Sequence, residues 1–188
     1  MLVINLIKVL LILVLFIYVL TRKDKDYLLK VAFLFTFASD VILAIATGAE
    51  SNISNPEIGG INLLLLGTMV FCFAQLAYFC RHCPYKTLLK IYLPITIIII
   101  ATTFILAPEA ALIIFAFIYA LTEVFNLIFT LKQDRRTALG FALFIACDLT
   151  IALGFINIIP GAAADWICWL FYLPAQIILA ISPKPVLK

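Results

Sequence analysis

This chain of 188 residues is 66% hydrophobic and 12% charged, with a mean hydropathy of +1.22. Soluble domains carry about 25% charged residues, so the composition excludes a soluble globular protein and indicates an integral membrane protein. The net charge of +3 comes from Lys and Arg gathered in a few connections, which favours a topological role over nucleic-acid binding.

Seven mainly apolar runs are long enough for membrane-spanning helices, which need roughly 20 residues. They cover residues 2–21, 27–48, 61–80, 87–106, 109–132, 137–159 and 165–183. The strands of a membrane barrel alternate apolar and polar residues, whereas these runs are continuously apolar. The connections are too short to hold a soluble domain. We therefore predict one all-α integral membrane domain over residues 1–188, with seven transmembrane helices in a single bundle.

Positive charge alternates between the connections. The first, third and fifth connections and the tail hold the basic residues Arg22, Lys23, Lys25, Lys30, Arg81, Lys86, Lys90, Lys132, Arg135, Arg136, Lys184 and Lys188. The other connections contain acidic residues and neither Lys nor Arg. By the positive-inside rule, the amino terminus is outside and the carboxyl terminus is cytoplasmic. We expect a multi-pass protein of a bacterial inner membrane.

Two charged residues interrupt the first two runs. Lys8 lies about a turn and a half inside its helix, where it either extends its ammonium to the interface or turns inward to pair with a carboxylate or a phosphate. Asp40 lies about 20 Å along its helix, near mid-membrane. A carboxylate in hydrocarbon costs several kcal/mol, and such residues usually face a bundle interior or a cavity. Asp40 is therefore a candidate site residue, with a structural pairing role as the alternative.

The third run carries Gln75 and Tyr78, which are three residues apart and share a helix face. Both can point at one cavity, although Gln75 could equally bond another helix. The run ends in Cys80-Arg81-His82-Cys83, whose cysteines and histidine could supply part of a metal site. The sequence has no second Cys or His cluster that would complete the four ligands. We predict no metal there and a reduced surface loop instead.

The fifth run provides a third intramembrane carboxyl group. Tyr119, Glu123 and Asn126 follow one another at steps of four and three along one helix face. Glu123 is thus a candidate site residue whose neighbours on the same face are also polar.

The last two runs repeat features of the second and third. Asp148 lies about 17 Å along the sixth helix, a depth similar to that of Asp40. In the seventh run Tyr172 and Gln176 are four apart on one face, while Trp166 and Trp169 are expected to anchor the interface.

The two halves of the chain share a short sequence similarity. Asp40 and Asp148 each precede a helix that contains an Ala-Gln pair, at Gln75 and at Gln176. Because both halves run in the same direction, helices one to three and five to seven could be parallel repeats, with the fourth helix as the linker.

The order of these residues resembles that of the YhhN family, which includes lysoplasmalogenases. The corresponding positions are Lys8, Ser39-Asp40, Gln75 with Tyr78, Tyr119, Asp148 with Ala152, and Tyr172 with Gln176. The chain departs from the family at Gln75, where histidine is frequent, and at Cys147, where serine is frequent. The proline that often follows the family lysine is missing too. Members commonly show eight helices, so this chain would lack the first.

The resemblance implies cofactor-independent hydrolysis of the vinyl ether bond of a lysoplasmalogen or related lysolipid, which gives a fatty aldehyde and a glycerophospho-alcohol. Acid-promoted cleavage needs a proton donor, a stabiliser for an oxocarbenium ion, and a water. Asp40 and Asp148 form the expected catalytic pair, with no basis for deciding which is the acid. The expected substrate-binding or water-positioning residues are Lys8, Gln75, Tyr78, Tyr119, Glu123, Tyr172 and Gln176.

The main alternative is a small proton- or cation-coupled transporter that uses Asp40, Glu123 and Asp148 at the midplane. Glu123, which has no counterpart in the family pattern, favours this alternative. A non-catalytic lipid-binding protein is a further possibility, because Gln75 replaces the frequent histidine.

Overall fold

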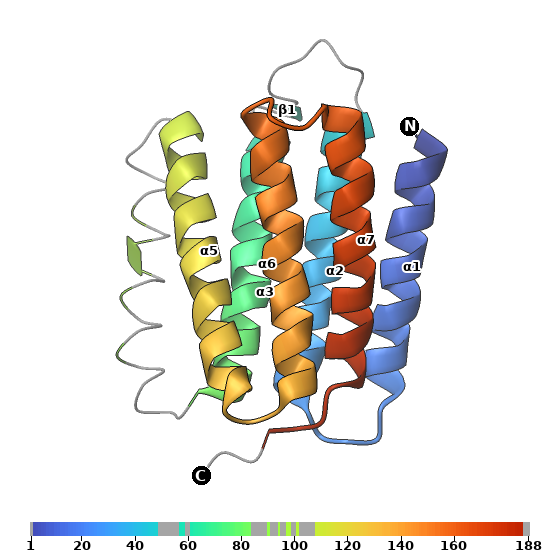
Figure 1. Cartoon of the computed structure of the whole chain (residues 1–188), viewed down its shortest axis with the longest axis vertical. Coiled ribbons are helices and arrows are strands. Elements are labelled where there is room, and N and C mark those ends of the chain that lie inside the picture. Colours follow the sequence, from blue (N-terminus) through green and yellow to red (C-terminus); the bar gives the residue numbers. More distant parts are fainter. Residues whose placement is uncertain are drawn as a thin grey trace.

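The computed structural model describes residues 2–48, 57–58, 61–83, 90, 94, 97–98, 101 and 108–185. Six long helices within these ranges stand side by side as one bundle (Figure 1). They are α1 (Leu2–Thr21), α2 (Tyr27–Gly48), α3 (Leu63–His82), α5 (Pro108–Leu131), α6 (Arg135–Phe155) and α7 (Gly161–Ile181). The predicted fourth span, 87–106, falls almost entirely outside the described residues.

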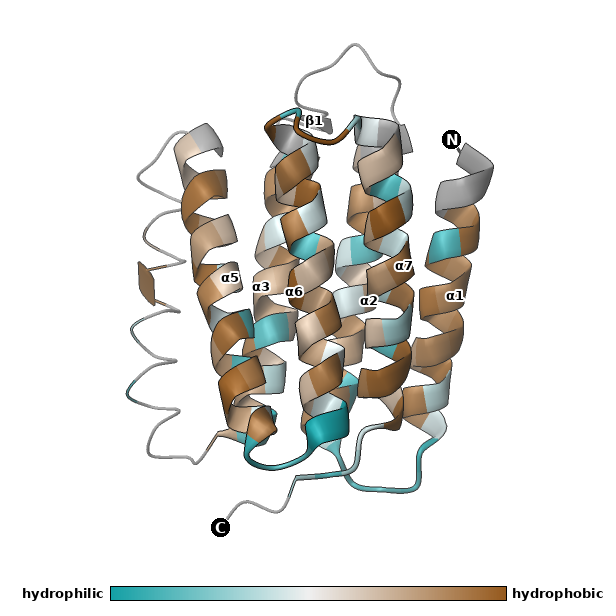
Figure 2. Ribbon diagram, viewed as in Figure 1, coloured by the Kyte–Doolittle hydropathy of each residue, from teal (hydrophilic) through white to brown (hydrophobic). Residues whose placement is uncertain are grey.

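The helices confirm an all-helical, multi-pass membrane protein. Five of them, α2, α3, α5, α6 and α7, are long and apolar enough to cross a membrane, while the apolar stretch Leu6–Thr21 of α1 is shorter. Apolar residues run along the helices, and hydrophilic residues gather at the end of the bundle where the C-terminus lies (Figure 2). We call this end, which holds Lys25, Arg81 and Arg135, the basic end. The number of seven spans, the repeat and the orientation stay predictions.

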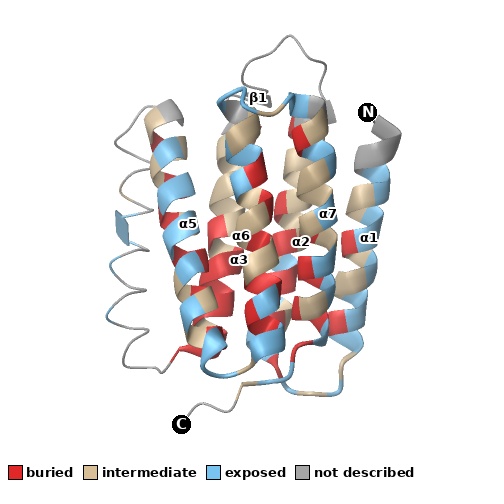
Figure 3. Ribbon diagram, viewed as in Figure 1, coloured by how far each residue is buried: buried red, intermediate tan, exposed pale blue. Residues whose placement is uncertain are grey.

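Each described helix packs against two neighbours, so that the six close into a ring. Contacts join α1 to α2, α2 to α3, α3 to α5, α5 to α6, α6 to α7 and α7 back to α1. Buried residues are concentrated in the half of the bundle near the basic end (Figure 3). The other half therefore has room for a cavity.

The connection between α6 and α7 differs from the prediction by four residues at each end. The sixth helix ends at Phe155 instead of 159, and the seventh begins at Gly161 instead of 165. Asn157 adopts a left-handed backbone with φ of 57°, and Pro160 occupies the N-cap of α7. These residues break the helix although Ile158 and Ile159 keep the connection apolar, because backbone conformation outweighs hydropathy there.

The two-residue strands β1 (Glu57–Ile58) and β2 (Ile61–Asn62) form an antiparallel pair that leads into α3. The Asn62 side chain accepts a hydrogen bond from the Leu65 N–H at 3.0 Å, which caps the helix. The cap explains why α3 begins at Leu63, two residues later than predicted.

The Cys-Arg-His-Cys segment is not a surface loop, which corrects that prediction. Arg81 and His82 close the last turn of α3, and both side chains are buried, as is that of Cys83. The Arg81 guanidinium donates to Asp26 Oδ2 at 2.8 Å and to Ser182 Oγ at 2.8 Å. These contacts come from residues distant in sequence, so the local motif could not reveal them. Among the described residues, no group of three His, Cys, Asp or Glu side chains could hold a metal ion.

Asp134 caps α6 and gives a stability prediction. Its carboxylate accepts from the Thr137 hydroxyl at 2.6 Å and the Thr137 N–H at 3.1 Å, and these hydrogen bonds lower the pKa of Asp134. We expect Asp134→Ala to reduce the free energy of unfolding by about 1 kcal/mol, whereas Asp134→Asn, which keeps an acceptor, should lose less. Thermal unfolding in detergent micelles would measure both variants.

The pH dependence of this cap has a definite sign. Because the folded-state pKa of Asp134 is depressed, its contribution is full above the unfolded value of about 3.9 and is lost as the pH falls through the folded value. The stability difference between wild type and Asp134→Ala should therefore shrink below about pH 4. A difference that stays constant or grows there would contradict the assignment.

Candidate active site

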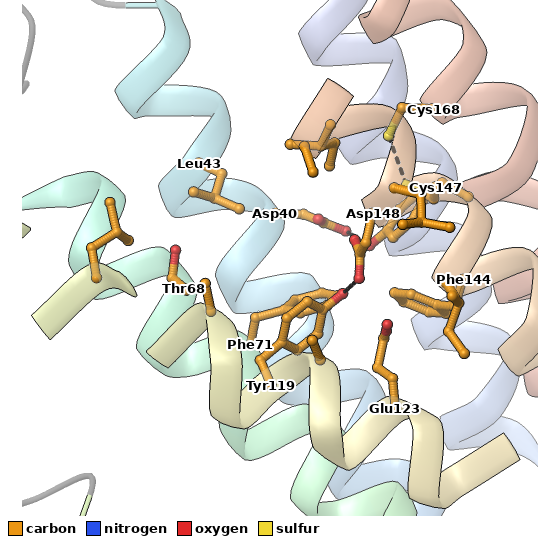
Figure 4. Close-up of a pocket in the computed structure, with 18 of the residues that line it drawn as sticks. Asp40, Leu43, Thr68, Phe71, Tyr119, Glu123, Phe144, Cys147, Asp148 and Cys168 are labelled. Carbon is orange, nitrogen blue, oxygen red and sulfur yellow. Dashed lines mark hydrogen bonds between the residues drawn. The ribbon is translucent and has the colours of Figure 1, made fainter. Parts of the chain in front are cut away.

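Asp40 and Asp148 lie at the same depth in the bundle. Each is 13 residues beyond the first residue of its helix, α2 and α6 respectively, and both helices start at the basic end. At 1.5 Å per residue this places both about 20 Å from that end. Their carboxyl groups face one another across a cavity (Figure 4).

A close helix contact directs Asp40. The preceding residue, Ser39, donates a hydrogen bond to the Gly67 carbonyl at 2.8 Å. A Cβ at Gly67 would lie 2.6 Å from Leu43 Cδ2, so a larger residue would have to displace the Leu43 side chain where α2 approaches α3. With Ser39 turned to α3, Asp40 faces α7, where the Tyr172 hydroxyl donates to its Oδ2 at 2.6 Å.

Asp148 has two partners on one face of α5. The Tyr119 hydroxyl donates to Asp148 Oδ2 (Figure 4). The Glu123 carboxyl group lies close enough to interact electrostatically with that of Asp148. Glu123 is buried, and its Oε1 accepts from Gln75 Nε2 at 2.9 Å. Asn126 Nδ2 in turn donates to Gln75 Oε1 at 3.2 Å. The predicted polar face of α5 thus hydrogen-bonds to Gln75 on α3 through Glu123 and Asn126, and to Asp148 on α6 through Tyr119.

These three carboxyl groups lack a basic partner among the described residues, where the salt bridges join Arg22 to Asp24 and Arg81 to Asp26. Two adjacent buried carboxylates repel one another and lose hydration, so a site of this kind holds at least one proton. The Glu123–Asp148 pair can therefore store a proton, while Asp40 lies across the cavity with its own hydroxyl donor.

The cavity has a volume of about 730 Å³ and a mainly apolar wall. It lies in the half of the bundle away from the basic end, and its lining comes from α2, α3, α5, α6 and α7. Several lining residues on α5 and α6 are strongly exposed, including Ile113 at 71% and Leu149 at 59%. We infer from them that the cavity opens sideways between α5 and α6, toward the lipid.

Four predicted site residues do not line this cavity. The Lys8 ammonium lies 4.9 Å from the centre of the Trp169 ring on α7, and it is not part of either salt bridge among the described residues. Gln75, Tyr78 and Gln176 are buried behind the wall. Of the two roles expected for Gln75, the structure shows the bond to another helix, because Gln75 donates to Glu123 on α5. Tyr78 packs between Phe33 and Phe141 and does not line the cavity.

Three residues that line the cavity were not identified from the sequence. Trp169, which was expected to anchor the interface, lines the cavity, whereas Trp166 is exposed. Cys147 and Cys168 also line it, with their sulfur atoms 2.7 Å apart. Trp169 and Cys168 precede Tyr172 by three and four residues, so shared helix-face spacing could have identified both.

Comparison with known proteins identifies a family for this chain. The model of the YhhN family matches residues 3–182, nearly the whole chain. No curated protein and no solved structure matches.

Proposed function

Because the chain belongs to the YhhN family, we propose that it is a membrane-embedded hydrolase that cleaves the vinyl ether bond of lysoplasmalogens. Family membership is consistent with such an enzyme. One observation on this chain supports the proposal. Three carboxyl groups lie on the wall of an apolar cavity that opens toward lipid, and none of them has a basic partner among the described residues. Intramembrane carboxyl groups are costly to retain and usually mark a site.

The carboxyl groups can supply both functions that the chemistry needs. The Glu123–Asp148 pair gives its stored proton to the outer alkene carbon of the vinyl ether, which leaves an oxocarbenium ion on the carbon bonded to oxygen. Asp40, ionised and held by Tyr172, stabilises this cation and orients a water. The water adds to the cation and loses a proton to a carboxylate. The resulting hemiacetal collapses to a fatty aldehyde and an alcohol, so atoms and charge balance.

The cavity fits the chain of such a lipid. Ligand sites commonly measure about 300–1,000 Å³ and are mostly apolar with a few polar groups, as this one is. An alkenyl chain that enters between α5 and α6 brings its ether bond to the carboxyl groups without leaving the membrane.

Product analysis tests the proposal. Purified protein should release fatty aldehyde from choline or ethanolamine lysoplasmalogens, and should leave the matched alkyl-ether and acyl lysolipids intact. Saturated ethers cannot form the oxocarbenium ion by protonation at carbon, which makes the alkyl ether the sharper control. Release of fatty acid from the acyl lysolipid, or no aldehyde from either vinyl ether, would overturn the proposal.

The adjacent Glu123 and Asp148 carboxyl groups also fit the second candidate, a proton- or cation-coupled transporter. Such a protein would take up solute into proteoliposomes in response to an imposed proton or cation gradient, without turning over lysolipid. Uptake that disappears in Glu123→Gln while lysolipid stays intact would select the transporter.

A further inference from the structure

Five buried side-chain polar atoms have no hydrogen-bond partner among the described residues, and one of them is Asn126 Oδ1 on α5. The other four come from α2, α3 and α7 and are Thr36 Oγ1, the Tyr78 hydroxyl, and both Oε1 and Nε2 of Gln176. All three side chains are 0% exposed. A buried polar atom without a partner loses its hydrogen bonds to water and gains none in return, so four such atoms in one region require a physical explanation.

The three side chains lie at one level. Thr36 is one helical turn from Asp40, and Gln176 is one turn from Tyr172, each in the direction of the basic end. Because Asp40 and Tyr172 are hydrogen-bonded to each other, both turns descend by about 6 Å from the same point. The Tyr78 hydroxyl faces the Thr36 hydroxyl from α3, although their geometry does not complete a hydrogen bond.

Polar groups continue on both sides of this level. Above it are Asp40 and the Tyr172 hydroxyl, at the cavity. Below it, three residues after Tyr78, Arg81 begins the buried network with Asp26 and Ser182 at the basic end. The unpartnered atoms thus occupy the gap in a polar column that otherwise runs from the cavity to the basic end of the bundle.

We propose that Thr36, Tyr78 and Gln176 form an internal water site that connects the basic end to Asp40. A buried water typically makes about three hydrogen bonds, so one or two waters would satisfy these four atoms. Hydrolysis consumes water, and the apolar cavity opens to lipid, so this route supplies the reactant from the aqueous side. The supply role rests on the proposed hydrolase; the hydration of the site does not.

Radiolytic hydroxyl-radical labelling tests the hydration directly, because radicals formed from bound water oxidise the side chains beside it. In the full-length protein in detergent micelles, Tyr78 should be oxidised several-fold faster than Phe115, after correction for their intrinsic reactivities. Phe115 is a matched control, since it is also 0% exposed but packs in an apolar cluster. Oxidation of Tyr78 at the rate of Phe115 would overturn the water site.

Two substitutions separate the site from the enzyme. Gln176→Leu should bring Tyr78 oxidation down to the level of Phe115, and Thr36→Val, a near-isosteric change, should lower it partly. Where hydrolysis is measurable, Gln176→Leu should reduce kcat several-fold at unchanged KM, and Gln176→Asn should restore part of the loss. A labelled Tyr78 together with an unchanged kcat in Gln176→Leu would overturn the supply role alone. Absence of hydrolysis in wild type leaves the labelling result valid and counts only against the hydrolase.

Discussion

Replacing Asp148 with asparagine is expected to lower kcat for lysoplasmalogen hydrolysis by about 10²–10⁴-fold, the usual contribution of a positioned general acid or base. The amide cannot share a proton with Glu123, and it still accepts the hydrogen bond of Tyr119, so the fold should persist. Asp40→Asn should show a loss of similar size, because the variant can no longer stabilise the cation. Aldehyde release in detergent micelles measures both variants.

An exposed carboxylate provides the control for these variants. Asp165 lies in the first turns of α7 and is exposed, so Asp165→Asn should keep the parent rate. Glu123→Gln should resemble Asp148→Asn, since it removes the other half of the pair. Folded Asp40→Asn and Asp148→Asn variants that release aldehyde at the parent rate would rule out the mechanism.

Arg81→Met is expected to cause the largest loss of stability, about 3–5 kcal/mol, because it leaves Asp26 buried without its partner. The loss includes the hydrogen bonds that hold Ser182 and Pro183 against α3. Chemical unfolding in mixed micelles would measure this change.

Two comparisons identify the cause of that loss. The double variant Arg81→Met/Asp26→Asn should recover part of it, because no unpaired charge then remains. Arg22→Met removes a more exposed ion pair with Asp24 and should cost at most about 1 kcal/mol from that pair. Equal losses at Arg81 and Arg22 would contradict the distinction between the buried and the exposed pair.

The helices and the depth of the aspartates could be predicted from the sequence because hydropathy and helical rise act locally. The boundaries near Asn157 and Pro160 could not, since those residues interrupt an apolar run by backbone conformation alone. The position of Trp169 in the cavity wall could not be predicted either, because a tryptophan near a helix end is as compatible with the lipid interface as with a cavity wall.

The arrangement of the site depended on which helices are neighbours. Helical spacing placed Tyr119, Glu123 and Asn126 on one face, but only the packing of α5 between α3 and α6 brings Glu123 to Asp148 and Gln75. The sequence predicts a pair of carboxyl groups, Asp40 and Asp148, and the structure adds Glu123 as a third on the same cavity wall. The burial of Arg81 is a similar case, because its partners Asp26 and Ser182 are 55 and 101 residues away.

The central claim is that the carboxyl groups deliver a proton to the vinyl ether carbon, and hydrolysis in D₂O tests it most directly. Each molecule of fatty aldehyde should then carry one deuterium on the carbon next to the carbonyl group. Unlabelled aldehyde incubated under the same conditions corrects for exchange after release. Aldehyde without deuterium, formed by active protein, would contradict protonation at carbon and with it the role of the carboxyl groups as the acid.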